Sequence, residues 1–238
     1  MADRGIPFSA PMIRALLDGT KTQTRRIQAE GVSMAGSIDH SSGRPIAIDA
    51  TAWDRRWPVK TKYAVGDRLW VREAWRTGNG FDEVNATTMA ERCLDAGYKK
   101  PWAPIQYEAD KSVRDWILDG HAFGTRPGRY RHARFMPRWA SRLTLTVTDV
   151  RVQRLQDISE ADAWAEGCKR GDPTDNGGYF PADEHDQTKC CVRGWDNARD
   201  WFSDLWDSLN GEGAWDANPW VAAYTFTVAH CNIDQVAA

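Results

Sequence analysis

The sequence predicts an α+β fold, in which a small mixed or antiparallel sheet is flanked by short helices and interrupted by long loop insertions. The stretch 143–148 alternates apolar and polar residues, which is typical of a half-buried strand. Two short segments, 9–17 and 159–166, carry the signals of capped helices instead. Because strands and short helices alternate irregularly along the chain, we expect an α+β arrangement.

The first helix is predicted to follow Ser9, which suits an N-cap, and to end at Gly19, which suits the left-handed residue that closes a helix. Apolar residues fall at helical spacing between these two positions: Met12, Ile13, Leu16 and Leu17. The next segment, from Lys21 to Thr24, is either a turn or an extended strand. A turn would bring the side chains of Lys21 and Thr24 together.

A lysine close to a hydroxyl group is a combination that can cleave acyl bonds. A partly desolvated lysine is neutral often enough to remove the proton from a threonine, which then attacks a carbonyl group. The alternative is that Lys21, Arg25 and Arg26 form a solvated basic edge and that the threonines are ordinary strand residues. Short runs of this kind are common, so the spacing alone does not separate the two interpretations.

A loop insertion and then a strand are predicted next. Residues 28–60 are rich in Gly, Ser, Ala and Asp without sustained periodicity, which is typical of a long loop. A strand is expected at 68–75, where Leu69, Val71 and Glu73 share one face. On that apolar face, Glu73 is either a buried partner of an arginine or of the backbone, or a catalytic carboxylate.

The strongest helix signal of the second half begins at Ser159, an N-cap in a capping box, and ends at Gly167. Glu166 falls in the last turn, where the helix dipole disfavours negative charge, so it is either a solvated surface acid or a functional residue. Further elements are expected elsewhere: a helix within 81–98, strands at 105–109, 143–152 and 224–228, an amphipathic helix at 198–209, and loop insertions at 76–103 and 168–195.

The composition is that of a folded globular protein. With 238 residues and 42% hydrophobic content, the chain can form a substantial core, and we expect one domain over 1–238. No run approaches the length of a membrane span and the N-terminal sequence lacks a signal-peptide pattern, so we expect a cytoplasmic protein without a membrane partner. The sequence contains no GxGxxG, GxxxxGK[ST] or HExxH motif, and no cofactor is expected.

The five cysteines lack the regular spacing of a disulfide framework, so free thiols are expected. Cys168, His185, Cys190 and Cys191 lie in one polar stretch and are residue types that bind zinc. However, the stretch has no CxxC pair, and adjacent cysteines rarely both bind one zinc ion. We therefore predict no metal site, and this cluster is the one candidate for zinc.

Charge is distributed unevenly, although the net charge is only −2. Residues 121–156 contain eight arginines against one acid, whereas acids prevail over 157–220, so a cationic face is expected. Within this region, the segment 124–139 mixes arginines with Tyr130, Phe135 and Trp139, as on surfaces that contact phosphates and stack on bases. A loop whose aromatic residues dock on the core has the same composition. The candidate contacts with nucleic acid are Arg129, Arg131, Arg134 and Arg138.

Four segments together resemble ASCH-domain proteins: FSAPMIRALLDGTKTQTRR, YAVGDRLWVREAW, LQDISEADAWAEG and NPWVAAYTF. The most specific element is the GxKTxTxR signature, formed here by Gly19, Lys21, Thr22, Thr24 and Arg26. The chain is most similar to the larger ASCH proteins common in phages and prophages, in which insertions surround a core of roughly 100 residues. The resemblance implies a PUA-like fold, a small β-barrel related to RNA-binding PUA modules.

The resemblance also implies an activity, since some ASCH-domain proteins are amidohydrolases that cleave N(4)-acetylcytidine to cytidine and acetate. Their catalytic lysine, threonine and glutamate correspond to Lys21, Thr24 and Glu166, and Glu73 is the second candidate for the glutamate. Contacts with this small nucleoside substrate are expected from Thr22, Arg26, Trp70, Glu73 and Trp75.

Two other functions are considered beside this one. A non-catalytic module that binds RNA or a modified base would need basic and aromatic groups but no carboxylate beside Lys21, and its binding would depend on salt. A ribonuclease using the same pocket is the third interpretation. Acid-base cleavage usually recruits histidine, and the sequence has none near the GxKTxTxR signature.

Overall fold

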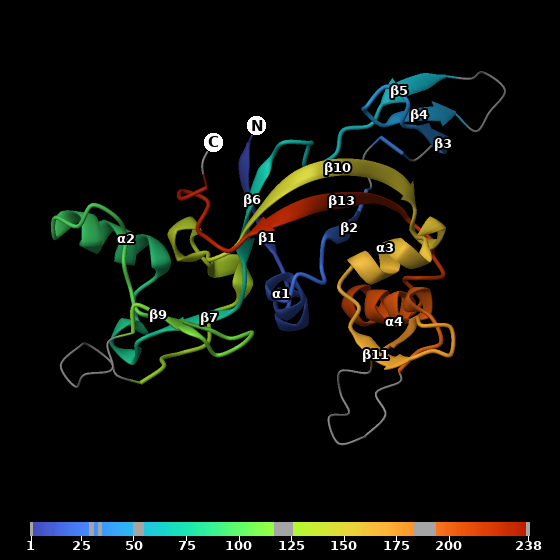
Figure 1. The fold of residues 1–238 in the computed structure, drawn as a ribbon. Coiled ribbons are helices and arrows are strands. Elements are labelled where there is room, and N and C mark those ends of the chain that lie inside the picture. Colours follow the sequence, from blue (N-terminus) through green and yellow to red (C-terminus); the bar gives the residue numbers. More distant parts are fainter. Residues whose placement is uncertain are drawn as a thin grey trace. The chain divides into compact units, whose positions relative to one another are not determined.

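The computed structural model describes residues 2–28, 31–32, 35–49, 55–116, 126–182 and 194–236 (Figure 1). The chain divides into two compact units. The first unit comprises Met1–Leu17, Asp67–Thr146 and Val228–Ala238, and the second comprises Asp18–Gly66 and Val147–Thr227. The chain passes from one unit to the other after Leu17 and Gly66, and also within two long strands, β10 (Thr144–Arg154) and β13 (Trp220–Ala229).

In the first unit, helix α1 (Ala10–Leu17) follows Ser9, whose carbonyl accepts a hydrogen bond from the N–H of Ile13. This confirms the helix predicted at 9–17. Strand β1 (Asp3–Pro7) pairs in parallel with β6 (Arg68–Arg72), which pairs antiparallel with the start of β10. The other elements of this unit are β7 (Trp75–Thr77), α2 (Ala86–Asp95), β8 (Ile105–Tyr107), β9 (Val113–Arg114) and 3-10 helices at Asn79–Phe81, Ala133–Phe135 and Arg138–Ala140.

One hydrophobic cluster of the first unit is built on the small sheet β7-β8-β9. Its buried residues are Trp75, Ile105, Tyr107, Met136 and Ala140. Removal of this apolar surface from water is the main favourable contribution to the stability of the unit. The predicted helix within 81–98 is confirmed as α2, which begins at Asn85, whose side chain accepts a hydrogen bond from the N–H of Thr88.

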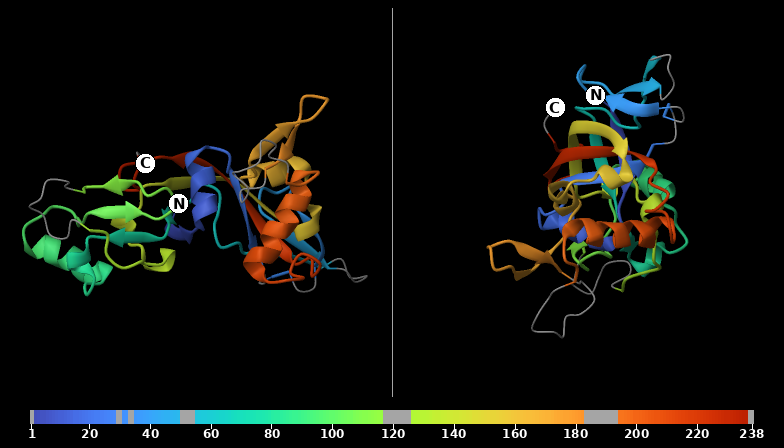
Figure 2. Two further views of the ribbon diagram at one scale, coloured as in Figure 1. Left: turned by 90° about the horizontal axis from the view of Figure 1, so that it is seen from below. Right: turned by 90° about the vertical axis from the view of Figure 1, so that its right-hand side faces the viewer.

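In the second unit, β2 (Gln23–Ile27) pairs antiparallel with β13. Helix α3 (Glu160–Ala165) begins at Ser159, whose side chain accepts a hydrogen bond from the N–H of Asp162, as the capping box predicts. The amphipathic pattern at 198–209 is confirmed as α4 (Ala198–Asn210), which packs beside α3 (Figures 1 and 2). The core between them contains Leu155, Ile158, Ala163, Phe202, Trp206 and Val221.

Helix α4 is joined to α3 by a contact at its N-terminus. The carboxylate of Glu160 accepts hydrogen bonds from the N–H groups of Ala198 and Arg199, at 2.7 and 3.2 Å. A negative charge at this end of a helix is favourable because the first N–H groups lack partners within the helix. The remaining elements of the second unit are β3 (Ala35–Asp39), β4 (Ile46–Asp49), β5 (Arg56–Pro58), a 3-10 helix at Leu155–Asp157, β11 (Arg170–Pro173) and β12 (Tyr179–Pro181).

The predicted α+β class is confirmed. The long strands belong to a sheet with the order β1-β6-β10-β13-β2, and within the described residues this sheet is open, with edges at β1 and β2. Both views of Figure 2 show β10 and β13 adjacent along their lengths. The region 28–60, predicted as a loop, contains the antiparallel sheet β3-β4-β5. No helix in the described ranges is long and apolar enough to cross a membrane.

Candidate active site

The side chains of Lys21 and Glu166 form a buried ion pair in the second unit. Lys21 follows Gly19, which adopts a φ of 73°, and its backbone forms an isolated antiparallel bridge with Glu166. The Nζ atom of Lys21 donates hydrogen bonds to Oε2 of Glu166 at 2.9 Å and to its backbone oxygen at 2.7 Å. The side chains are 0% and 3% exposed. The structure therefore brings together two of the three residues to which the resemblance assigns catalysis.

The position of Glu166 is set by the end of α3. Glu166 caps the helix, and Gly167 continues the chain with a φ of 103°, in the left-handed region that glycine adopts readily. The helix dipole disfavours an acid here, but the positive charges of Lys21 and Arg25 offset that effect. Because Glu166 is buried, its interpretation as a solvated surface acid is wrong.

A second cation, Arg25, shares the carboxylate of Glu166. Its Nη1 donates to Oε1 of Glu166 at 2.9 Å, and its Nη2 donates to Oδ2 of Asp162 at 3.1 Å. Asp162 also accepts hydrogen bonds from Gln23 at 3.2 Å and from Arg151 at 2.9 Å. Since Lys21 and Arg25 are both buried, they do not form the solvated basic edge that was the alternative interpretation.

Burial lowers the pKa of Lys21, because the charged amine has lost its contact with water. Glu166 opposes this effect by stabilising the ammonium form, whereas Arg26 and Arg25 lower the pKa further by repulsion. The balance is a pKa below the ordinary value of 10.5. A lysine of this kind has a larger neutral fraction near pH 7 than an exposed lysine, and the neutral amine is the form that can accept a proton.

Thr24 is buried in the middle of β2, directly opposite Tyr224 of β13. Gln23 and Arg25, on either side of it, both contact Asp162, so the alternation of a strand directs Thr24 to the other face, which is that of Tyr224. The ring of Tyr224 packs edge to face against Tyr63 at a centroid distance of 5.1 Å. Lys21 to Thr24 is thus extended and not a turn.

Two other residues of the GxKTxTxR signature frame this site. Arg26 is half-buried, and burial lowers its pKa, while Glu166, Tyr63 and Tyr224 raise it. Thr22 is exposed, and its backbone links two elements: its N–H donates to Ala165 at 2.9 Å and its carbonyl accepts from Phe226 at 3.0 Å. The signature therefore connects the end of α3 to β13.

The predicted substrate contacts Trp70, Glu73 and Trp75 belong to the first unit. Trp70 lies under the guanidinium group of Arg72, 4.4 Å from its ring centroid, and Trp75 is fully buried. Glu73 is bound at both oxygens by Arg142, at 2.8 and 2.9 Å, and burial raises its pKa. The interpretation of Glu73 as the buried partner of an arginine is confirmed.

The four arginines predicted to contact nucleic acid separate into two groups. Arg138 is held by ion pairs with Asp3 at 2.7 Å and Asp234 at 2.6 Å. The other three line one pocket of the first unit. The members of this second group are Arg129, Arg131 and Arg134.

Sequence reasoning missed Gln23, Arg25 and Asp162 as members of the site. The signals were available, because Gln23 and Arg25 alternate with Lys21 along an extended segment and Asp162 precedes Glu166 by one helical turn. The cluster of Tyr63 and Tyr224 was also missed, since 161 residues of sequence separate the two, by the difference 224 − 63. Their pairing depends on tertiary structure.

The candidate zinc cluster falls largely outside the described residues, which include Cys168 but not His185, Cys190 or Cys191. Cys168 is buried, and its Sγ lies 3.6 Å from the backbone oxygen of Lys169. Among the described side chains, no group of three or more His, Cys, Asp or Glu residues could hold a metal ion.

No protein-family model matches the chain, and comparisons with curated proteins and with solved structures find no similar protein.

Proposed function

We propose that the protein is an amidohydrolase of the ASCH type, with a PUA-like core, that removes the acyl group from the exocyclic amine of N(4)-acylated cytidine. N(4)-Acetylcytidine, which would yield cytidine and acetate, is the first substrate to test. The observation that supports this proposal is the buried contact between Lys21 and Glu166, in which a lysine of lowered pKa is oriented by a carboxylate. The resemblance contributes the substrate class.

In the proposed mechanism, neutral Lys21 removes a proton from a water molecule, and the resulting hydroxide attacks the acyl carbonyl. The bond between the acyl carbon and N4 of cytosine then breaks, the Lys21 ammonium returns its proton to the leaving amine, and the carboxylic acid is released. Glu166 orients Lys21 throughout. Thr24 is assigned the positioning of the substrate, because its side chain faces the side of β2 opposite Gln23 and Arg25.

A variant of this mechanism uses a covalent intermediate. Thr24 would give its proton to Lys21 and attack the acyl carbonyl, and water would then hydrolyse the ester on Thr24. This route requires β2 to change its conformation so that the side chains of Thr24 and Lys21 face each other. Rapid quenching during turnover, followed by mass spectrometry of the intact protein, distinguishes the two routes. An acyl adduct that is present in the wild type and absent from Thr24→Val supports the covalent route.

The activity is tested by following the ultraviolet absorbance change as N(4)-acetylcytidine loses its acyl group. Lys21→Met, Thr24→Val and Glu166→Gln each remove one functional group at nearly constant volume, and each is expected to lower kcat by at least about a hundredfold. Matched controls make the same chemical changes at exposed positions: Lys111→Met, Thr148→Val and Glu83→Gln. These three should retain wild-type activity.

Two results would contradict the proposal. One is a folded wild-type protein that is inert on N(4)-acetylcytidine and on analogues with longer acyl chains. The other is full activity in Lys21→Met, since Lys21 would then not be required as the base. Circular dichroism of each variant establishes that it is folded.

A further inference from the structure

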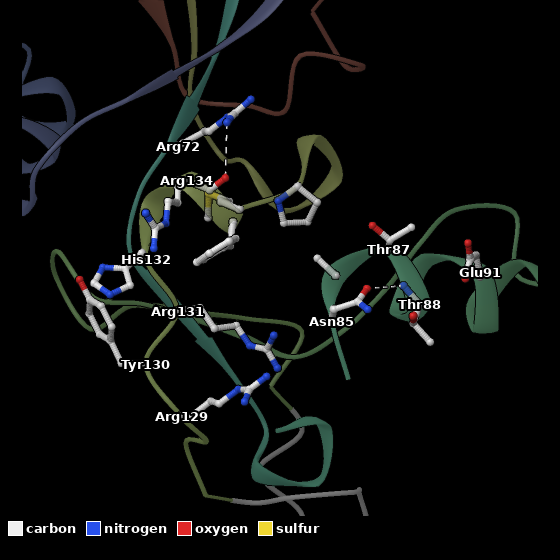
Figure 3. Close-up of a pocket in the computed structure, with 14 residues that line it drawn as sticks. Arg72, Asn85, Thr87, Thr88, Glu91, Arg129, Tyr130, Arg131, His132 and Arg134 are labelled. Atoms are coloured by element: carbon white, nitrogen blue, oxygen red, sulfur yellow. Dashed lines mark hydrogen bonds between the residues drawn. The ribbon is translucent and has the colours of Figure 1, made fainter. Parts of the chain in front are cut away.

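A pocket of about 830 Å³ lies in the first unit. The residues assigned to hydrolysis belong to the second unit. One wall is the segment 129–137, the opposite wall is the beginning of α2, and Arg72 closes one end (Figure 3). We call it the arginine pocket, after its four arginines: Arg72, Arg129, Arg131 and Arg134.

These four arginines differ from their neighbours in forming no ion pair with a carboxylate of the described residues. Arg76, Arg138 and Arg142 of the same unit each form such ion pairs. Two acids lie near the pocket: Glu91 lines it, and Asp82 accepts a hydrogen bond from the N–H of Arg129 at 2.7 Å and opposes the lowering of the pKa of Arg131. Positive charge is therefore in excess here, although the net charge of the chain is −2.

Arg131 is the most buried of the four, at 8% exposure. Its Nη2 donates to the carbonyls of Phe81 at 2.8 Å and Val84 at 2.9 Å, and these bonds fix the guanidinium group. Its Nε is buried without a hydrogen-bond partner among the described residues. Burial lowers the pKa of Arg131, and the positive charge of Arg129 lowers it further. Figure 3 shows both guanidinium groups directed toward the beginning of α2.

The positive charges of these arginines repel one another when no ligand is bound, and an anion between them would reduce that repulsion. Helix α2 adds a second favourable contribution, because Ala86, Thr87 and Thr88 of its first turn line the pocket. The first N–H groups of a helix and its dipole favour negative charge at this end. Arginine is also the side chain whose planar donors match the oxygen atoms of a phosphate group.

Exposed aromatic rings at the same pocket indicate what the anion is attached to. Phe135 and Tyr130 are 56% and 46% exposed, which is unusual for such large side chains. The guanidinium group of Arg134 lies 4.7 Å from the ring centroid of Phe135, and His132 packs edge to face against Tyr130. Aromatic rings next to arginines are the combination on which the bases of single-stranded nucleic acids stack.

We propose that the arginine pocket binds a nucleotide of single-stranded nucleic acid, with the phosphate held by Arg129, Arg131 and Arg134 and the base stacked on Phe135, the more exposed of the two rings. This binding is independent of the proposed hydrolysis, because its residues are different. A free mononucleotide offers the same chemistry, so the experiment includes both sources.

The test is the fluorescence anisotropy of a labelled short single-stranded RNA, titrated with the full chain at several salt concentrations. Arg129→Ala combined with Arg134→Ala is expected to weaken binding by at least about tenfold. The same change should reduce the slope of log affinity against log salt by about 2, or about 1 for each phosphate contact. Both residues are exposed, so the double variant should fold, whereas Arg131 supports the backbone and is left intact.

Arg92→Ala is the matched control, since Arg92 is an exposed arginine of α2 that does not line the pocket. It removes one positive charge from the same unit and should change affinity less than twofold, by roughly the effect of one distant charge. Phe135→Ala should weaken RNA binding by about tenfold and leave competition by inorganic phosphate unchanged. Competition by cytidine monophosphate as effective as that by RNA would identify the free nucleotide as the source.

Three results would overturn the proposal. The first is wild-type protein that binds neither RNA nor cytidine monophosphate. The second is a double arginine variant that binds as tightly as Arg92→Ala. The third is equal competition by inorganic phosphate and cytidine monophosphate together with no effect of Phe135→Ala, which would define an anion site without base recognition. These variants leave Lys21 and Glu166 unchanged. The results on RNA binding are therefore independent of whether the protein is an amidohydrolase.

Discussion

Glu166 binds a different cation with each of its carboxylate oxygens. Oε2 accepts from Lys21 and Oε1 accepts from Arg25, at 2.9 Å in both cases. A buried charge whose partner is removed costs several kcal/mol, about 3–5 in well-packed sites. Arg25 has a second partner in Asp162, whereas the carboxylate that Lys21 contacts is shared with Arg25. Burial, together with repulsion from Arg26 and Arg25, explains why the pKa of Lys21 is lowered in spite of the ion pair.

The first prediction at this scale concerns the titration of Lys21, observed by NMR in protein labelled with ¹³C at lysine and assigned with Lys21→Met. The wild-type pKa is expected below 10.5, and Glu166→Gln should lower it further, because Glu166 stabilises the ammonium form. The lowered pKa also determines how the free energy of unfolding changes with pH. Between the folded pKa and 10.5 the unfolded chain binds more protons, so the free energy of unfolding rises with pH in this window.

Lys21→Met has no ionisable group at this position, so its free energy of unfolding should not show this rise with pH. Urea titrations at several pH values measure the difference from the wild type. A wild-type pKa at or above 10.5, or a higher pKa in Glu166→Gln, would contradict the electrostatic explanation. Both measurements are made on the protein without substrate. Their outcome is therefore independent of whether N(4)-acetylcytidine is cleaved.

At the scale of elements, α3 is the support of the candidate active site, because Asp162 and Glu166 both belong to it or to its end. The helix has only six residues, too few to be stable without capping and packing. Its N-terminus is capped by Ser159 and its C-terminus ends at Gly167. The contact of Glu160 with the first N–H groups of α4 adds a third constraint.

Removal of the cap is predicted to destabilise the unit that contains α3. Ser159→Ala deletes the acceptor for the N–H of Asp162 and should lower the free energy of unfolding by about 1 kcal/mol. Ser208→Ala, at an exposed serine of α4, is the control and should change it by less than about 0.5 kcal/mol. Urea unfolding followed by tryptophan fluorescence measures both. Equal effects of the two substitutions would show that the cap contributes nothing specific.

The elements predictable from sequence are those specified by neighbouring residues. The cap at Ser159, the apolar spacing of α1 and α4, and the alternation of β10 are all local signals, and the structure contains each of them. The sheet β3-β4-β5 was missed because its buried positions include the small residues Ala35 and Ala47, which give little hydrophobic pattern. Strand β1 was missed because its pairing with β6 depends on residues 65 positions away, by the difference 68 − 3.

The same distinction applies to the candidate site. The residue types of the GxKTxTxR signature are visible in the sequence, but the contact between Lys21 and Glu166 spans 145 positions. Only the resemblance to ASCH-domain proteins suggested that these two residues meet. One interpretation placed Arg25 on a solvated edge, because charged side chains are seldom fully buried, and tertiary contacts with Asp162 and Glu166 override that tendency.

At the scale of the molecule, the chain forms two compact units, and each contains a hydrophobic cluster made of its own residues. The cluster of the first unit includes Trp75 and Met136, and that of the second includes Phe202 and Trp206. Each of the two functional proposals concerns residues of one unit. The residues proposed for hydrolysis belong to the second unit and the arginine pocket belongs to the first.

This division predicts that a cavity made in one core acts mainly on the unit that contains it. Phe202→Ala should lose about 3–5 kcal/mol of stability and Met136→Ala about 2–5, because each leaves an unfilled volume in a packed core. Hydrogen exchange followed by mass spectrometry should show faster exchange in peptides of the second unit for Phe202→Ala and of the first for Met136→Ala. Uniform acceleration across both units by either variant would contradict the prediction.

The two hydrogen bonds that Lys21 donates to Glu166 leave the number of protons on its nitrogen free to change. A lysine ammonium carries three N–H groups, whereas the neutral amine carries two N–H groups and one lone pair. The two acceptors on Glu166, Oε2 and the backbone oxygen, need only two N–H groups. Lys21 can therefore gain or lose a proton while both bonds to Glu166 persist. The orientation of its nitrogen is then the same before and after proton transfer, and the chemical step requires no rearrangement of this pair.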